Sequence, residues 1–167
     1  DNLTVARPAL EYVIGWLDRN APEAAGLVLC HGDFRTGNYM VHNGRLSGLL
    51  DWEFAHWGDR HEDIAWLTAR CWRFGAVGRE AGGIGSRAAF YAGYEAETPG
   101  LLDSGVVGYW EVLSAARWAV VALLQGERHL SGGEVSLELN LTGMMAPEME
   151  YEALKGIEAL ERGGQGG

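Results

Sequence analysis

The amino-acid sequence predicts an α+β fold that is mainly helical and contains one small β-hairpin. Apolar residues recur at helical spacing in residues 4–20 and through most of the chain after residue 60. Between these segments, two short apolar runs flank Asn43-Gly44, a dipeptide typical of hairpin turns because both of its positions tolerate a positive φ. The 167 residues, 47% of them hydrophobic, suffice for one sizeable core, so we expect one domain over residues 1–167.

The expected elements before residue 60 are one helix and three strands. The helix covers residues 4–20, with Pro8 in its first turn and Pro22 beyond its end. Its apolar face follows the spacing i, i+3, i+4, i+7 with Leu10, Val13, Ile14 and Leu17. A short buried strand is expected at residues 27–30. Two further strands, at residues 39–42 and 45–50, form the hairpin.

Helices dominate the expected structure after residue 60. They cover residues 60–71, 88–95, 106–124, 134–145 and 147–160, with a break at Gly132-Gly133. The glycine-rich residues 161–167 are expected to form a flexible tail. Residues 78–86 are also glycine-rich but contain no Gly-Lys-Ser or Gly-Lys-Thr and follow no apolar strand, so we interpret them as a flexible loop rather than a phosphate-binding loop.

Charge and cysteine content disfavour several kinds of partner. Thirteen Lys and Arg against 23 Asp and Glu give a net charge of −10, which disfavours nucleic acid because neutralising phosphates requires a basic surface. Cys30 and Cys71 lack the spacing of a disulfide framework, which favours a reduced, cytoplasmic setting. The longest apolar run, residues 118–124, is too short to cross a bilayer, so we expect no membrane partner. The sequence leaves the oligomeric state open.

The most informative motif is His-Gly-Asp-Phe-Arg-Thr-Gly-Asn at residues 31–38, followed by Asp51 after the hairpin. A carboxylate on a loop between strands can accept the proton of a hydroxyl group and aim its oxygen, so Asp33 is the expected catalytic base. Asn38 offers a neutral oxygen and Asp51 a charged one, and Mg²⁺ prefers such hard ligands. The hairpin folds its far end back beside its near end, so we expect the three side chains to converge.

These motifs resemble those of the aminoglycoside phosphotransferase and choline kinase-like family. H-G-D-x-x-x-x-N at residues 31–38 and L-D-W-E at residues 50–53 match its catalytic loop and metal-binding motif. Residues 58–65 resemble its G-D-P-x-x-D-L-A segment, with Arg60 in place of proline. The protein-kinase motifs H-R-D-x-x-x-x-N and D-F-G are a more distant match. The resemblance is specific over residues 27–75.

The resemblance implies the C-terminal lobe of a protein kinase-like fold, with residues 27–75 as catalytic loop and metal site and residues 76–160 as a helical substrate-side region. It implies an ATP-dependent phosphotransferase that transfers the γ-phosphate to an alcohol group of a small acceptor. In that family the carboxylate matched by Asp33 orients or deprotonates the hydroxyl group, and the residues matched by Asn38 and Asp51 hold Mg²⁺. Aminoglycosides, choline-like amines, sugars, macrolides and hydroxyacyl compounds remain open as acceptors.

Four further residues are expected to support the site. By resemblance, Asp63 braces the catalytic loop from the helix that follows, although an acidic residue also suits a helix N-terminus. His31 is expected to brace the loop by hydrogen bonds to the backbone rather than to act as the base. Glu53 either reaches the metal through water or forms a structural salt bridge. Arg35 either contacts substrate or phosphate or is an exposed loop residue.

The nucleotide-binding half of a kinase is expected to lie outside this sequence. Kinase-like catalysis also needs a glycine-rich hairpin and a strand lysine. The chain has a single lysine, Lys155, and by resemblance the nucleotide lobe precedes the catalytic loop. We therefore expect the 167 residues alone to be inactive.

Two other functions and one other metal site are alternatives to this interpretation. A kinase-like binding module without catalysis would be expected to lose one of the three site residues, and all three are present. A metal-dependent phosphoesterase would need a Gly-Asn-His-Glu type segment, which is not found. A zinc site built on His42, His56 or His61 with Glu62 is set aside because the histidine spacing does not suit one helix face and no cysteine lies nearby in the sequence.

Overall fold

The computed structural model describes residues 6–23 and 25–164. They divide into two compact units, and the expectation of one domain over residues 1–167 stays a prediction. The helical unit comprises residues up to 21 and from 112 onward, and the motif unit comprises residues 22–111. Every candidate site residue belongs to the motif unit.

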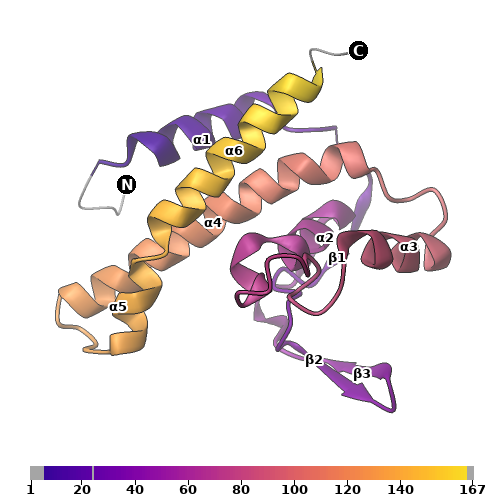
Figure 1. The fold of residues 1–167 in the computed structure, drawn as a ribbon, viewed down its shortest axis with the longest axis horizontal. Coiled ribbons are helices and arrows are strands. Elements are labelled where there is room, and N and C mark those ends of the chain that lie inside the picture. The colour runs from indigo at the N-terminus through magenta and orange to yellow at the C-terminus, as the bar shows by residue number, and fades with distance from the viewer. Residues whose placement is uncertain (1–5, 24, 165–167) are drawn as a thin grey trace. The chain divides into compact units, whose positions relative to one another are not determined.

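The helical unit consists of α1 (Pro8–Arg19), the later part of α4 (Ser104–Leu130), α5 (Leu137–Gly143) and α6 (Ala146–Gly164). α1 lies along α6 in the same direction (Figure 1), with Arg7 paired to Glu150 and Trp16 Nε1 donating to Glu161 Oε1 at 3.2 Å. α4 and α5 approach so closely that a Cβ on Gly143 would lie 2.7 Å from the Gly126 Cα atom.

Several predicted boundaries in this unit were wrong. α1 begins at Pro8, in the first-turn position where proline's missing N–H costs nothing. The first two predicted helical residues, 4 and 5, lie outside the described residues. Ile14 is 53% exposed, and Trp16 takes its place on the buried face. α6 continues to Gly164, so residues 161–164 are helical and the rest of the predicted tail, residues 165–167, lies outside the described residues.

The strands of the motif unit form two antiparallel pairs. β2 (Tyr39–His42) and β3 (Arg45–Leu49) form the predicted hairpin, with φ of 50° and 72° at Asn43 and Gly44, and the hairpin extends away from α2 in Figure 1. β1 (Leu27–Cys30) was predicted, but its partner β4 (His56–Asp59) was not. β1 was expected to be buried, yet only Cys30 is buried and Leu27 is 71% exposed.

Short helices complete the motif unit. They are a 3₁₀ turn over Trp52–Phe54, α2 (Arg60–Thr68), a second 3₁₀ turn over Arg70–Arg73, α3 (Arg87–Glu97) and the first turns of α4. Ile64 and Ala65 of α2 pack with Val107 of α4, and aromatic and leucine side chains surround them: Phe90, Tyr91, Tyr94, Leu102 and Trp110.

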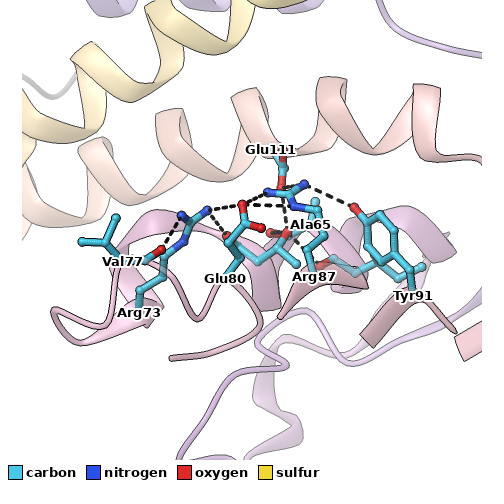
Figure 2. A network of polar contacts seen from close by, with 9 residues as sticks. Ala65, Arg73, Val77, Glu80, Arg87, Tyr91 and Glu111 are labelled. Carbon is cyan, nitrogen blue, oxygen red and sulfur yellow. Dashed lines mark hydrogen bonds and ion pairs between the residues drawn. The ribbon is translucent and has the colours of Figure 1, made fainter. Parts of the chain in front are cut away.

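A polar network joins these helices inside the unit (Figure 2). Arg87 pairs with Glu111 at 2.6 Å and with Glu80 at 3.3 Å, and the Thr68 hydroxyl group donates to Glu111 at 2.7 Å. Burial lowers the pKa of Arg87, but the negative charge of Glu111 and the contact with Tyr91 outweigh it, so the net pKa lies above its ordinary value. Arg87 therefore stays charged, and the network fixes α3 to α2 and to the start of α4.

Residues 78–86, interpreted above as a flexible loop, form a packed turn. Ala81 pairs with Gly85 in an isolated β-bridge, and Ala81 is 5% exposed. The Gly82 N–H donates to the Leu67 carbonyl at 2.9 Å, and the Gly82 carbonyl accepts from the Thr36 hydroxyl at 2.7 Å. The segment therefore supports the loop at residues 31–38.

By length and composition alone, α4 is the one helix among the described residues that satisfies the criteria for crossing a membrane, with a mean hydropathy of 1.3 over its most apolar 18 residues. The core helix of a soluble protein satisfies the same criteria. Val112, Ala116 and Ala119 of α4 are buried, and 39% of the most apolar 18-residue window is buried.

Candidate active site

The candidate site is built on the loop at residues 31–38, which leaves β1 and enters β2. β1 is held by its pairing with β4, and the β2–β3 hairpin returns the chain to the end of the loop. There the Leu50 N–H donates to the Asn38 carbonyl at 2.8 Å. The residue after Leu50 is Asp51, so the hairpin brings the second motif beside the first.

Asp33 is buried, and N–H groups of three side chains converge on its carboxylate. Trp66 Nε1 donates to Oδ1 at 2.7 Å, and Asn38 Nδ2 donates to Oδ2 at 2.7 Å. Arg35 Nε donates to Oδ2 at 3.2 Å. A carboxylate offers about four acceptor positions, so these bonds fix its orientation and leave room for one further donor such as a hydroxyl group.

Asn38 is 4% exposed and uses its amide nitrogen twice on Asp33, on Oδ2 and on the backbone carbonyl at 2.9 Å. If the amide were turned around, its oxygen would face the Asp33 carboxylate, and two acceptors would repel each other. The hydrogen-bond pattern therefore assigns the nitrogen, and not the oxygen, to the side that faces Asp33. The amide oxygen of Asn38 therefore makes no hydrogen bond to Asp33. The structure therefore brings Asp33 and Asn38 into direct contact.

Asp63 holds the start of the loop. Its Oδ2 accepts the His31 N–H at 2.6 Å, and its Oδ1 accepts the Gly32 N–H at 2.9 Å. These are the contacts expected of a brace. His31 uses both ring nitrogens on the backbone, since Nδ1 accepts the Asp33 N–H at 3.2 Å and Nε2 lies 2.8 Å from the Leu50 carbonyl. The tautomer with its proton on Nε2 satisfies both contacts and leaves no ring nitrogen for proton transfer.

Gly32 couples the loop to the 3₁₀ turn that follows Asp51. At φ +76°, a Cβ on residue 32 would lie 2.3 Å from the Phe54 carbonyl oxygen. The His31 ring also lies against the Trp52 ring, with 4.7 Å between their centroids. The arginine that protein kinases carry at this position would not fit here, so the H-G-D and D-W-E motifs depend on each other.

Arg35 is partly exposed, but it is not a free loop residue. Besides its bond to Asp33, its guanidinium lies 4.7 Å from the centroid of the Trp72 ring. Two contacts in this area were not predicted from the sequence: the hydrogen bond from Trp66 to Asp33 and the contact of Arg35 with the Trp72 ring. The signal for the first contact is present in the sequence, because Trp66 lies on the helix after the motif and its indole N–H can donate a hydrogen bond.

Asp51 and Glu53 lie at the edge of the site, exposed to solvent. Asp51 has the left-handed backbone conformation, with φ 64° and ψ 61°. Within the described residues neither side chain makes a hydrogen bond or ion pair, so neither a salt bridge of Glu53 nor direct contact of Asp51 with Asp33 is seen. The structure brings Asp51 to the loop through the backbone of Leu50 only.

Asp59 fixes the start of α2, the helix that carries Asp63 and Trp66. Its Oδ1 accepts from the His61 N–H at 2.9 Å and from His61 Nδ1 at 2.6 Å, and its Oδ2 accepts the Ala25 N–H at 3.0 Å. Burial raises the pKa of Asp59, but these hydrogen bonds outweigh it and the net pKa lies below its ordinary value. The cap therefore works as a carboxylate.

A family model and several relatives match this chain. The family model of the phosphotransferase enzyme family matches residues 1–99. An aminoglycoside 3′-phosphotransferase from Streptomyces fradiae is 40% identical over 62 residues, which cover 36% of this chain and 23% of that protein.

Solved structures extend the likeness to nearly the whole chain. A Ralstonia eutropha protein assigned to the aminoglycoside phosphotransferases has a TM-score of 0.77 and 26% identity over 93% of this chain, and the chain spans 50% of its length. A thermostable mutant of an aminoglycoside phosphotransferase, solved with AMP-PNP and hygromycin B, has a TM-score of 0.55 and 21% identity, over 95% of this chain and 43% of its own. The chain therefore spans half or less of the relatives it matches.

Proposed function

We propose the following function for a chain that belongs to the phosphotransferase enzyme family: the complete protein transfers the γ-phosphate of ATP to an alcohol group of a small molecule. In this proposal the chain is the C-terminal lobe of a kinase-like fold. A nucleotide-binding lobe completes the active site. A cytoplasmic location is part of the proposal, supported by the unpaired thiols of Cys30 and Cys71.

The observation that carries the proposal is the fixed carboxylate of Asp33. Trp66, Asn38 and Arg35 hold both of its oxygens, so its remaining acceptor position points in one direction. A hydroxyl group bound there donates its proton to Asp33, and its oxygen is thereby aimed at the phosphorus atom. Such positioning supplies most of the catalysis in phosphoryl transfer, where the protein contributes little covalent chemistry.

The residues present fit a Mg²⁺ ion. The amide nitrogen of Asn38 donates to Asp33, so its amide oxygen can serve as a neutral ligand of the metal ion. Asp51 is exposed beside the loop and offers a charged ligand. A bound Mg²⁺ would neutralise charge on the phosphate oxygens. The structural relative solved with AMP-PNP, an ATP analogue, supports ATP as the phosphate donor.

The acceptor belongs to the class of hydroxylated small molecules. The Streptomyces fradiae relative is an aminoglycoside 3′-phosphotransferase, and a structural relative was solved with hygromycin B. Aminoglycosides are therefore the first acceptors to test, followed by sugars and choline-like amines.

The test is ADP release by the complete protein over a panel of these acceptors. Replacing Asp33→Asn keeps the size of the side chain and removes the proton acceptor, so turnover should fall by about 10²–10⁴-fold. Nucleotide binding, measured by calorimetry, should survive. Asp18→Asn, an exposed change on α1, is the matched control and should leave turnover unchanged.

Two results would contradict the proposal. Turnover that is unchanged in Asp33→Asn would remove Asp33 from its role. A complete protein that neither binds Mg²⁺-nucleotide nor releases ADP with any acceptor would favour a binding module, and phosphate release without ATP would favour a phosphoesterase.

A further inference from the structure

Three potential metal ligands meet where β1, β4 and α2 come together. Cys30 ends β1, His56 begins β4, and Glu62 lies in the first turn of α2. Their ligand atoms, Sγ, a ring nitrogen and a carboxylate oxygen, all lie within 4.8 Å of one another. We propose that Cys30, His56 and Glu62 bind a zinc-class transition-metal ion, at a site separate from the Asn38–Asp51 pair.

The strand pairing explains why sequence spacing did not show this cluster. Cys30 and His56 are partners in the antiparallel β1–β4 register, although 26 positions separate them in the chain. Glu62 follows six residues after His56, and its Oε2 lies 3.0 Å from His56 Nε2. A cysteine therefore lies beside His56 and Glu62 in space, although none lies near them in the sequence.

His56 is already oriented as a metal ligand. Its Nδ1 lies 2.9 Å from the Phe54 carbonyl oxygen, which can only accept, so Nδ1 carries a proton. Nε2 is then the coordinating nitrogen, and it faces Glu62. A backbone carbonyl that fixes the second ring nitrogen is the usual outer partner of a metal-bound histidine, because it sets both the tautomer and the ring orientation.

Glycine at position 58 keeps the space between the ligands open. A Cβ there would lie 2.9 Å from His56 Nε2 and 3.3 Å from Cys30 Sγ. In a tetrahedral zinc site, bonds of 2.0–2.3 Å place ligand atoms about 3.3–3.8 Å apart. The three atoms therefore need to move by about an ångström or less to share one ion, with water as the fourth ligand.

The charge and softness of the donors select the metal. The carboxylates of Asp63, Glu62 and Asp59 act electrostatically on the Cys30 thiol. The same carboxylates create a negative field that attracts a dication, which then displaces the thiol proton. A thiolate and an imidazole suit Zn²⁺ or Co²⁺ and not Mg²⁺, so this site and the hard-oxygen pair bind different ions.

A metal here would tie together the segments that hold the catalytic loop. Cys30 directly precedes His31, and Glu62 directly precedes Asp63, which binds the loop backbone. The expected role is structural, and its readout is stability and spectroscopy rather than turnover.

The test is a titration of the chelator-treated chain with Co²⁺, followed by competition with Zn²⁺. We expect one equivalent of Co²⁺ to bind with a sulfur-to-cobalt charge-transfer band, Zn²⁺ to remove that band, and Zn²⁺ to raise the thermal midpoint. Cys30→Ser should weaken Co²⁺ binding by at least about 100-fold. This loss exceeds the 10–100-fold loss of metal affinity that follows when a hydrogen-bond partner of a metal ligand is removed. Cys71→Ser is the matched control and should keep the band.

Gly58→Ala keeps all three ligands and fills the space between them, so it should also abolish the band while circular dichroism shows a folded chain. The proposal is overturned if Co²⁺ binds without a sulfur band, or if the band persists in both Cys30→Ser and Gly58→Ala. Binding at the Asn38–Asp51 pair gives no sulfur band, so the two sites are distinguished.

Discussion

Replacing Gly32→Ala tests whether the H-G-D and D-W-E motifs are mechanically coupled. Residue 32 has φ +76°, and its new Cβ would lie 2.3 Å from the Phe54 carbonyl oxygen. Gly44 in the hairpin turn provides a control, because it has φ +72° and a Cβ there would meet nothing within 4 Å. The two variants share the backbone strain and differ only in the contact.

The difference between the variants can be estimated. An alanine in the left-handed region costs roughly 1–2 kcal/mol, and both variants carry that cost. Overpacking adds about 1–3 kcal/mol in Gly32→Ala alone, because a backbone carbonyl cannot turn aside as a side chain does. For a chain of this size each kcal/mol lowers the melting temperature by about 2–4 °C, so Gly32→Ala should melt about 2–12 °C below Gly44→Ala.

Tryptophan fluorescence is a suitable assay because five of the seven tryptophans lie in the motif unit. They are Trp52, Trp57, Trp66, Trp72 and Trp110. Equal melting temperatures for the two alanine variants would refute the coupling, since the strain would then account for the whole effect.

Two further predictions concern carboxylates around the loop. Asp63→Asn turns one acceptor into a donor opposite the N–H groups of His31 and Gly32, so the chain should lose about 2–3 kcal/mol of unfolding free energy in urea, against no change in Asp18→Asn. Asp59 has a folded-state pKa below its ordinary value of 3.8, so its stabilising effect is complete above that value and is lost as the pH falls through the folded pKa. The melting temperature of the unmodified chain should therefore fall more steeply below about pH 4 than that of Asp59→Asn, and parallel curves would contradict this assignment.

The local parts of the fold were predictable from the sequence. The Asn43-Gly44 hairpin depends on two adjacent residues, and both have the positive φ that the dipeptide favours. The contact between Asp33 and Asn38 arises within one loop, at a spacing that the motif fixes. Such features need no knowledge of distant pairing.

The non-local parts were not predictable. β4 reads His-Trp-Gly-Asp, which lacks both β-branched residues and alternation, and it forms because β1 pairs with it. The Trp66 hydrogen bond depends on where α2 packs against the loop, and periodicity can only classify this side chain as apolar. Ile14 was predicted on the buried face of α1, but Trp16 lies there instead, because the buried face depends on which helix covers it.

One backbone atom connects the catalytic loop to the proposed metal site. The Phe54 carbonyl oxygen would lie 2.3 Å from a Cβ on residue 32, and it lies 2.9 Å from His56 Nδ1. A metal bound to His56 would fix the imidazole and remove the freedom of that carbonyl to move away from a side chain at position 32. Metal binding and Gly32→Ala therefore act on the same atom, and their free energies should not add, because residues that share a partner are energetically coupled.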